Sequence, residues 1–185
     1  MKLCRGSRTV LLTIALFPFL CSGAAAQQEP TLVVLVRHAE AAAQPADDPG
    51  LTPEGTARAQ ALIGAVDGVA AVYTTQYLRT RATAEPLARA QGVEITVVEY
   101  PSNPMGGGGA ASTYAHALAE RIREEHGGET VVVVGHSNTI PPMVEALGAP
   151  SPGTIEHDRY DNLFIVVLPP GGPARLVRAK YGERS

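Results

Sequence analysis

The feature that most constrains the fold of this chain is a pair of short, continuous apolar runs, residues 31–36 (TLVVLV) and residues 130–134 (TVVVV). A strand with one solvated face alternates apolar and polar side chains, and neither run does so. Runs of this kind are typical of strands buried on both faces, as in parallel sheets covered by helices. They therefore predict a central sheet with a helical layer on each side.

The rest of the chain alternates between helix and strand patterns. We expect helices to be capped at their starts by Thr52 and Ser112. Gly92 is expected to end a helix. We expect helices over residues 53–66, 78–91, 112–126 and 141–147, further strands over 69–75, 93–100, 163–168 and 175–179, and a glycine-rich loop over 101–111. The last two strands are expected to pair antiparallel. The fold class is therefore α/β, a three-layer α/β/α sandwich with a mostly parallel central sheet.

The first 26 residues have the composition of a secretory signal peptide. Three cations among the first eight residues precede an apolar run of about 11 residues, and small residues follow up to Ala26. The run is shorter than the roughly 20 residues that span a bilayer, and Leu20 disfavours lipid attachment at Cys21. We expect cleavage after Ala26, one domain over residues 27–185 with no membrane span, and a periplasmic or secreted location.

Cleavage would also change the chemistry that remains available. Both cysteines, Cys4 and Cys21, lie in the leader, so the mature chain would have no thiol for a disulfide, a nucleophile or a metal site. The leader holds three Lys or Arg and no Asp or Glu, so its removal takes the formal net charge from −3 to −6. The acidic balance and the lack of tryptophan disfavour nucleic-acid binding. An anion site on such a chain must be a local cluster of cations.

Polar side chains follow three of the predicted strands at the points where those strands end. Arg37 and His38 follow the first strand, Arg79 follows the second by a few residues, and His136 follows the fourth. In open α/β sheets, ligands bind beyond the carboxyl ends of the strands. Each residue alone is typical of an ordinary surface, but their joint placement predicts one site. Two converging arginines would repel a metal cation, so we do not expect zinc between the histidines.

Three segments carry a resemblance to a known family. Residues 35–40 (LVRHAE), 72–85 (VYTTQYLRTRATAE) and 133–137 (VVGHS) resemble, in order and spacing, the motifs of the histidine phosphatase superfamily, or phosphoglycerate mutase-like family. The resemblance extends over about residues 32–181. It implies a phosphoglycerate mutase-like fold, here with little or no cap domain because only a short loop follows the third strand.

The resemblance also implies roles for the clustered residues. His38 would attack phosphorus and form a phosphohistidine that water then hydrolyses. Arg37, Arg79 and His136 would surround the phosphoryl oxygens and stabilise their charge. With these donors in place, no metal or other cofactor is expected.

Several roles remain open at this point. Glu99 is the best positional match for the general acid, and Glu40 is a second candidate, although that position more often supports the site in this family. Thr75 and Ser137 would either donate hydrogen bonds to phosphate or cap helices. The polar segment 156–162 is expected to form a turn, with the rim of the site as the alternative.

The combined prediction is an exported, metal-independent phosphatase that hydrolyses small phosphomonoesters through a phosphohistidine on His38. The alternative is a catalytically silent module of the same fold that binds phosphate or a phosphosugar. A structural envelope protein without a site would leave the three motifs unexplained.

Overall fold

The computed structural model describes residues 28–101 and 109–185. The expected leader and part of the glycine-rich loop therefore lie outside the described residues. A six-stranded sheet has the order β3-β2-β4-β1-β5-β6. The strands are β1 (Thr31–Arg37), β2 (Val69–Thr74), β3 (Ile95–Val97), β4 (Thr130–Gly135), β5 (Asn162–Leu168) and β6 (Arg175–Lys180).

The sheet is mostly parallel, as predicted. β1 pairs in parallel with β4, β4 with β2, and β2 with β3. β5 runs antiparallel to both β1 and β6, so it alone among the described strands reverses direction. The two apolar runs form β1 and β4, which lie side by side at the centre of the sheet, where both faces of a strand are covered.

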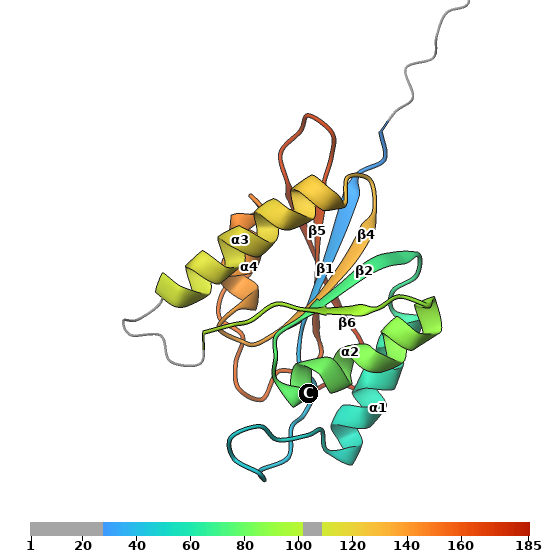
Figure 1. The fold of residues 1–185 in the computed structure, drawn as a ribbon, viewed down its shortest axis with the longest axis vertical. Helices are drawn as coiled ribbons and strands as arrows, with labels where there is room; N and C mark the ends of the chain where they lie inside the picture. The colour runs from blue at the N-terminus through green and yellow to red at the C-terminus, as the bar shows by residue number, and fades with distance from the viewer. Residues whose placement is uncertain (1–27, 102–108) are drawn as a thin grey trace, which may run out of the picture.

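Helices cover both faces of the sheet, which confirms the three-layer prediction (Figure 1). They are α1 (Pro53–Ala61), α2 (Leu78–Gln91), α3 (Gly109–Glu125) and α4 (Ile140–Ala146), with a 3₁₀ turn at Leu62–Gly64. α1 and α2 pack together on one face, and α3 and α4 pack together on the other. Two apolar clusters fill the two interfaces, one including Ile122 and Met143 and the other including Leu62 and Leu87.

The predicted caps of α1 and α2 are present. The Thr52 hydroxyl accepts a hydrogen bond from the Gly55 amide at 3.1 Å. Gly92 ends α2 with a φ of 69°, in the left-handed region that glycine adopts without strain. The first helix ends at Ala61 and continues only as the 3₁₀ turn, so its predicted end at residue 66 was too late.

Two other predicted boundaries were wrong. The structure places Ser112 inside α3, which begins at Gly109, so Ser112 is not its cap and residues 109–111 are not loop. The predicted third strand, residues 93–100, shortens to Ile95–Val97 because its ladder on β2 extends only over those residues. The described residues contain no large cap domain and no helix with the length and apolarity to cross a membrane.

Candidate active site

The two histidines are brought together by the central strand pair. β1 and β4 run parallel in register, with Arg37 opposite Gly135. His38 and His136 are the next residues on their strands, and the His38 amide donates to the Gly135 carbonyl at 2.8 Å. Their ring centroids lie 5.4 Å apart. The sequence prediction that strand ends bring these residues together is thus met by the geometry.

His38 presents a free ring nitrogen. Its Nδ1 lies 2.8 Å from the Ala39 carbonyl oxygen, which can only accept, so Nδ1 carries the proton and donates it. The lone pair of the neutral ring is therefore on Nε2. Burial, with a smaller contribution from the nearby Arg37 and Arg79 charges, lowers the pKa of His38 to about 4. The ring is neutral at pH 7, as a nucleophile must be.

His136 is held by hydroxyl groups. Its Nε2 lies 2.9 Å from Thr75 Oγ1, and its amide donates to Thr139 Oγ1 at 2.8 Å. Thr75 Oγ1 also contacts Thr80 Oγ1 at 2.9 Å. Burial, followed by the proximity of His38 and both arginines, lowers the pKa of His136 to about 3. Thr75 therefore pairs with the second histidine, and it does not cap α2, whose N-cap residue is Tyr77.

Arg37 is a buried cation without a carboxylate partner. Its Nη1 donates to the backbone carbonyls of Glu156 and His157 at 3.1 and 2.9 Å, and its guanidinium carbon lies 4.1 Å from the Tyr160 ring centroid. Its Nε is buried with no hydrogen-bond partner. Burial lowers the pKa of Arg37. The segment that follows Ile155 is therefore more than a polar turn, because its carbonyls orient this guanidinium.

Arg79 lies in the first turn of α2 and is about one-fifth exposed. Its guanidinium carbon is 4.4 Å from the Tyr77 ring centroid, and its Nη1 is 4.0 Å from Asp48 Oδ1. The same Asp48 oxygen accepts from the Leu78 amide at 2.8 Å, so a loop carboxylate caps α2 beside the site. Sequence reasoning missed Asp48, since no local pattern links residue 48 to the start of a helix thirty residues later.

Thr83 ties the two halves of the site together. Its hydroxyl accepts from the Ala39 amide at 2.9 Å and donates to the Arg79 carbonyl at 2.7 Å. The turn after β1 is thereby fixed against the first turns of α2. Thr83 and the fully buried Ala84 form the Thr-Ala pair of the second sequence motif.

The two candidate acids behave differently from each other. Glu40 accepts hydrogen bonds from Arg58 Nε at 3.0 Å and Nη2 at 2.8 Å. Burial alone would raise the pKa of Glu40, but Arg58 outweighs it and holds the pKa below its usual value. Glu40 is thus an ionised carboxylate paired with Arg58, and it supports the turn after β1 that carries His38. This agrees with the supporting role considered for that position.

Glu99 is exposed, and no hydrogen bond or ion pair joins it to the histidines in the described part of the chain. The next residue faces them instead: the Tyr100 ring centroid lies 6.1 Å from that of His136. Side chains alternate along extended backbone, so a shift of one residue exchanges the two directions. The structure brings Ser137 into the turn after His136, half-buried, without a side-chain hydrogen bond.

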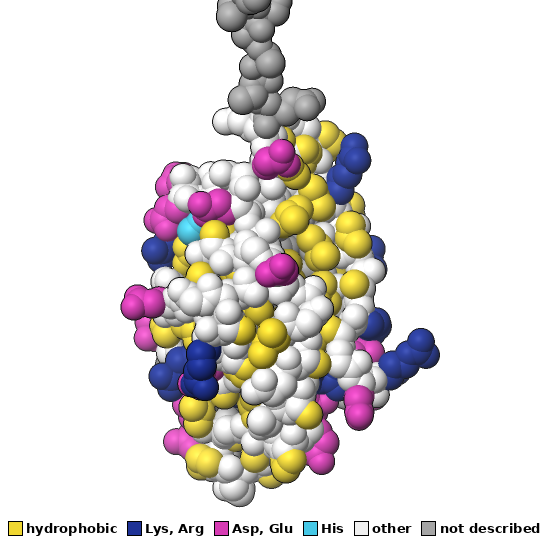
Figure 2. All heavy atoms as spheres, turned by 90° about the vertical axis from the view of Figure 1, so that its right-hand side faces the viewer, with side chains coloured by type: hydrophobic (Ala, Val, Ile, Leu, Met, Phe, Trp, Pro, Cys, Tyr) yellow, Lys and Arg dark blue, Asp and Glu magenta, His cyan; other side chains and the backbone are white. Residues whose placement is uncertain are grey.

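Charge at the site is local. On the face shown in Figure 2, basic and acidic side chains are interspersed.

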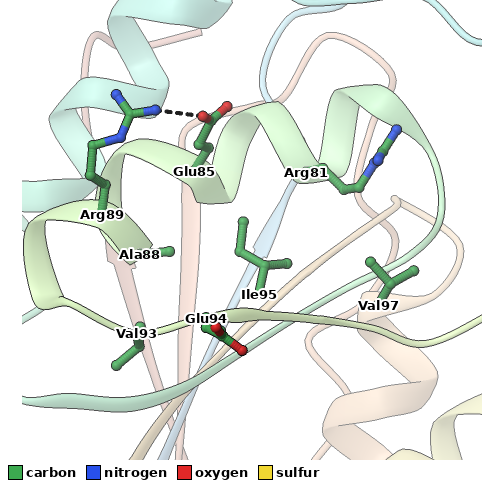
Figure 3. Close-up of a pocket in the computed structure, with 8 residues that line it drawn as sticks. All are labelled: Arg81, Glu85, Ala88, Arg89, Val93, Glu94, Ile95 and Val97. Carbon is green, nitrogen blue, oxygen red and sulfur yellow. Dashed lines mark hydrogen bonds and ion pairs between the residues drawn. The ribbon is translucent and has the colours of Figure 1, made fainter.

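A separate groove of about 510 Å³ lies between α2 and β3 (Figure 3). Arg89 and Glu85 are paired above Val93 and Ile95, and none of the predicted site residues lines the groove. Among residues 28–101 and 109–185, no group of three or more His, Cys, Asp or Glu is arranged to hold a metal. The described cations that face the histidines are Arg37 and Arg79.

Comparison with known families gives a direct match. Residues 33–100 match the model of the histidine phosphatase superfamily, branch 1. The predicted resemblance is confirmed. The matched segment includes Arg37, His38 and Arg79, whereas His136 lies beyond it. No curated protein sequence matches the chain.

Solved structures extend the likeness to the whole described fold. YhfR of Bacillus stearothermophilus is 20% identical with a TM-score of 0.62, over 84% of this chain and 98% of that one. The protein histidine phosphatase SixA, complexed with tungstate, is 21% identical with a TM-score of 0.56, over 80% and 96%. A mutant phosphoserine phosphatase of Entamoeba histolytica, bound to phosphoserine, is 14% identical with a TM-score of 0.57, over 82% and 96%. The fold is phosphoglycerate mutase-like.

Proposed function

We propose that this protein is a metal-independent phosphatase that hydrolyses phosphomonoesters through a phosphohistidine on His38. The observation that carries the proposal is the state of His38, a neutral ring with its Nε2 lone pair free, beside the guanidinium groups of Arg37 and Arg79. Arg37 forms no ion pair with a carboxylate in the described part of the chain, and Arg79 has one only at 4.0 Å, with Asp48. The branch 1 family match and the phosphatases among the structural neighbours support the same activity.

The proposed reaction has two steps. In the first, the Nε2 lone pair forms a bond to phosphorus while the ester P–O bond breaks and its electron pair leaves with the alcohol oxygen. In the second, water forms a bond to phosphorus, the P–N bond breaks, its electron pair returns to Nε2, and inorganic phosphate leaves. Arg37 and Arg79 neutralise charge on the phosphoryl oxygens in both steps. His136 places a further ring nitrogen beside these oxygens.

The direct test is hydrolysis of p-nitrophenyl phosphate by the purified protein in EDTA. His38→Ala is expected to abolish turnover, whereas His116→Ala, which removes an exposed histidine on α3, is the matched control. Undiminished turnover in His38→Ala would exclude the mechanism. Phosphate bound to His38 should also be recovered after rapid quenching, labile in acid and stable in base.

A second candidate, the silent phosphate-binding module, is favoured by one observation. Neither carboxylate considered as the acid is hydrogen-bonded to a histidine in the described part of the chain, since Glu40 is paired with Arg58 and Glu99 is exposed. Such a module would bind inorganic phosphate but would yield neither turnover nor phosphohistidine.

We also propose that the protein is exported. The support is the composition of residues 1–26, with three cations, an apolar run and small residues before Gln27. Expression of the full chain in a bacterial host should yield an extracytoplasmic protein whose first residue is Gln27. A protein that keeps Met1 and stays in the cytoplasm would refute export without bearing on the phosphatase activity.

A further inference from the structure

Three tyrosines surround the histidine pair. The Tyr77 and Tyr100 ring centroids lie 5.3 and 6.1 Å from that of His136, and the Tyr160 centroid lies 6.1 Å from that of His38. All three rings are half-buried, so part of each remains accessible. We call Tyr77, Tyr100 and Tyr160 the tyrosine rim. Only 5% of the chain is aromatic, so three rings at one site are a strong local enrichment.

Two members of the rim pack on the arginines. Tyr77 lies against Arg79 and Tyr160 against Arg37, with guanidinium carbons 4.4 and 4.1 Å from the ring centroids. These stacks orient the groups that would bind the phosphoryl oxygens. A role in holding arginines therefore accounts for both rings without reference to the rest of a substrate.

Tyr100 needs another explanation, because the recorded contacts of its ring involve no arginine. The Gln76 side chain fixes its backbone at both ends, with Nε2 donating to the Tyr100 carbonyl at 2.7 Å and Oε1 accepting from its amide at 2.9 Å. Its hydroxyl accepts from Asn138 Nδ2 at 3.2 Å, and Tyr114 packs edge-on at 5.5 Å between centroids. Tyr100 is thus a fixed flat surface next to His136.

The carboxylates point to the same class of substrate. All Asp and Glu of the chain lie in the described ranges, and none hydrogen-bonds to His38 or His136. A leaving oxygen that has no carboxylic acid within hydrogen-bonding distance departs as an anion and takes its proton from water. A phenol-type oxygen, with a pKa of about 10, carries that charge far better than an alkyl alkoxide.

We propose that the site takes aryl phosphomonoesters, with the aromatic ring of the leaving group seated against Tyr100. This inference deepens the proposed function and rests on it. An aryl leaving group is favoured for two reasons. Its ring packs on a fixed aromatic face, and its oxygen can depart without protonation by an acid. Tyr100 is then a specificity residue that contacts the substrate outside its phosphoryl group.

Binding of two phosphonates tests the seat without any chemistry. Phenylphosphonate and methylphosphonate share the phosphoryl oxygens and differ in the ring, and neither is hydrolysed. Calorimetric titration of the purified protein should give an affinity for phenylphosphonate about tenfold above that for methylphosphonate. Tyr100→Leu should bring that ratio close to one. Tyr100→Phe, which keeps the ring, should retain it and is the matched control.

The outcomes separate the seat from the reaction. Equal affinity of the wild-type protein for both phosphonates, or an unchanged ratio in Tyr100→Leu, would overturn the aromatic seat even if p-nitrophenyl phosphate is hydrolysed. Loss of the ratio in Tyr100→Phe would also overturn it and assign the role to the hydroxyl. Tighter binding of phenylphosphonate than of methylphosphonate, without turnover of p-nitrophenyl phosphate, would support the aromatic seat and contradict the proposed phosphatase activity. Thermal melting of each variant establishes that it is folded. If Tyr100→Leu is not folded, Tyr100→Met, which also removes the ring, takes its place.

Discussion

Two buried arginines, Arg58 and Arg37, have almost the same exposure, 6% and 4%, yet their surroundings differ in kind. Arg58 donates to both carboxylate oxygens of Glu40 and to the carbonyls of Tyr181 and Glu183. Arg37 donates to backbone carbonyls, packs on a tyrosine ring and leaves its Nε without a partner.

The difference separates a cation paired within the fold from one that the proposed function assigns to the substrate. Burying a charge costs several kcal/mol unless a counter-charge offsets it. For Arg58 the carboxylate of Glu40 is part of the fold, and although burial alone would lower the pKa of Arg58, its bonds to Glu40 raise it. For Arg37 burial lowers the pKa, and the more distant Glu40 charge offsets this only in part. Under the proposed function, Arg37 is therefore the cation that a bound phosphate would stabilise most.

The largest expected effect is on catalysis. Arg37→Ala should lower kcat/KM for p-nitrophenyl phosphate by about 10²–10³-fold, the range found when a donor to a developing anion is removed. Arg81→Ala, an exposed arginine two residues after Arg79, is the control and should stay near wild type. Full activity in Arg37→Ala would end the distinction between the two buried arginines.

The next effect is on stability. Arg58→Met should lower the free energy of unfolding by about 2–3 kcal/mol, below the range for fully buried pairs because the Glu40 side chain is 21% exposed. Urea denaturation measures it. Replacing Glu40 as well, in Arg58→Met/Glu40→Leu, should recover part of the loss, because no unpaired carboxylate then remains. Arg58→Met as stable as wild type would contradict the structural assignment.

Inorganic phosphate should stabilise the protein through Arg37. At ten times its dissociation constant it should add about 1.4 kcal/mol, which raises Tm by about 3–5 °C for a domain of this size. Arg58→Met should keep this increment although its starting Tm is lower, and Arg37→Ala should lose most of it. Loss of the increment in Arg58→Met, with the increment kept in Arg37→Ala, would assign anion binding to Arg58 and contradict the comparison.

The smallest effect is a change in the pKa of His38. An NMR titration should give a pKa of about 4, and Arg37→Gln should raise it somewhat, since burial is the larger cause and the Arg37 charge a lesser one. Arg58→Met should leave it where it is. An unfolded histidine titrates at about 6.5 and so binds its proton first, which means that stability must fall as the pH is lowered from about 6.5 to 4. A pKa of about 6.5 for His38 would contradict the effect of burial on this ring.

Local patterns predicted much of the fold. α2 has its predicted bounds because Gly92 supplies the left-handed stop, and β1 and β4 lie where the apolar runs placed them. Ser112 was misjudged because the preceding glycines were taken as loop, although α3 begins at Gly109. β3 is short because an edge strand extends only as far as its single neighbour pairs with it.

The candidate site was predicted where it depends on strand ends and missed where it depends on distant contacts. Arg37, His38, Arg79 and His136 meet because their strands are neighbours in the sheet. The pairing of Arg58 with Glu40 and the capping of α2 by Asp48 join segments far apart in sequence, and no local pattern marks them. Tyr100 rather than Glu99 faces His136, and both follow the end of β3 at Val97, so the strand pattern does not determine which of the two side chains turns toward the site.

The Thr83 hydroxyl links the turn that carries His38 to the turn that carries Arg79. It is fully buried, and the atom that accepts from the His38 turn is the atom that donates to the turn of Arg79. One oxygen atom thus joins the backbone next to His38 to the backbone of Arg79, so these two segments are coupled through a single side chain. Thr83 thus couples the two halves of the candidate site, although the proposed function gives it no contact with the substrate.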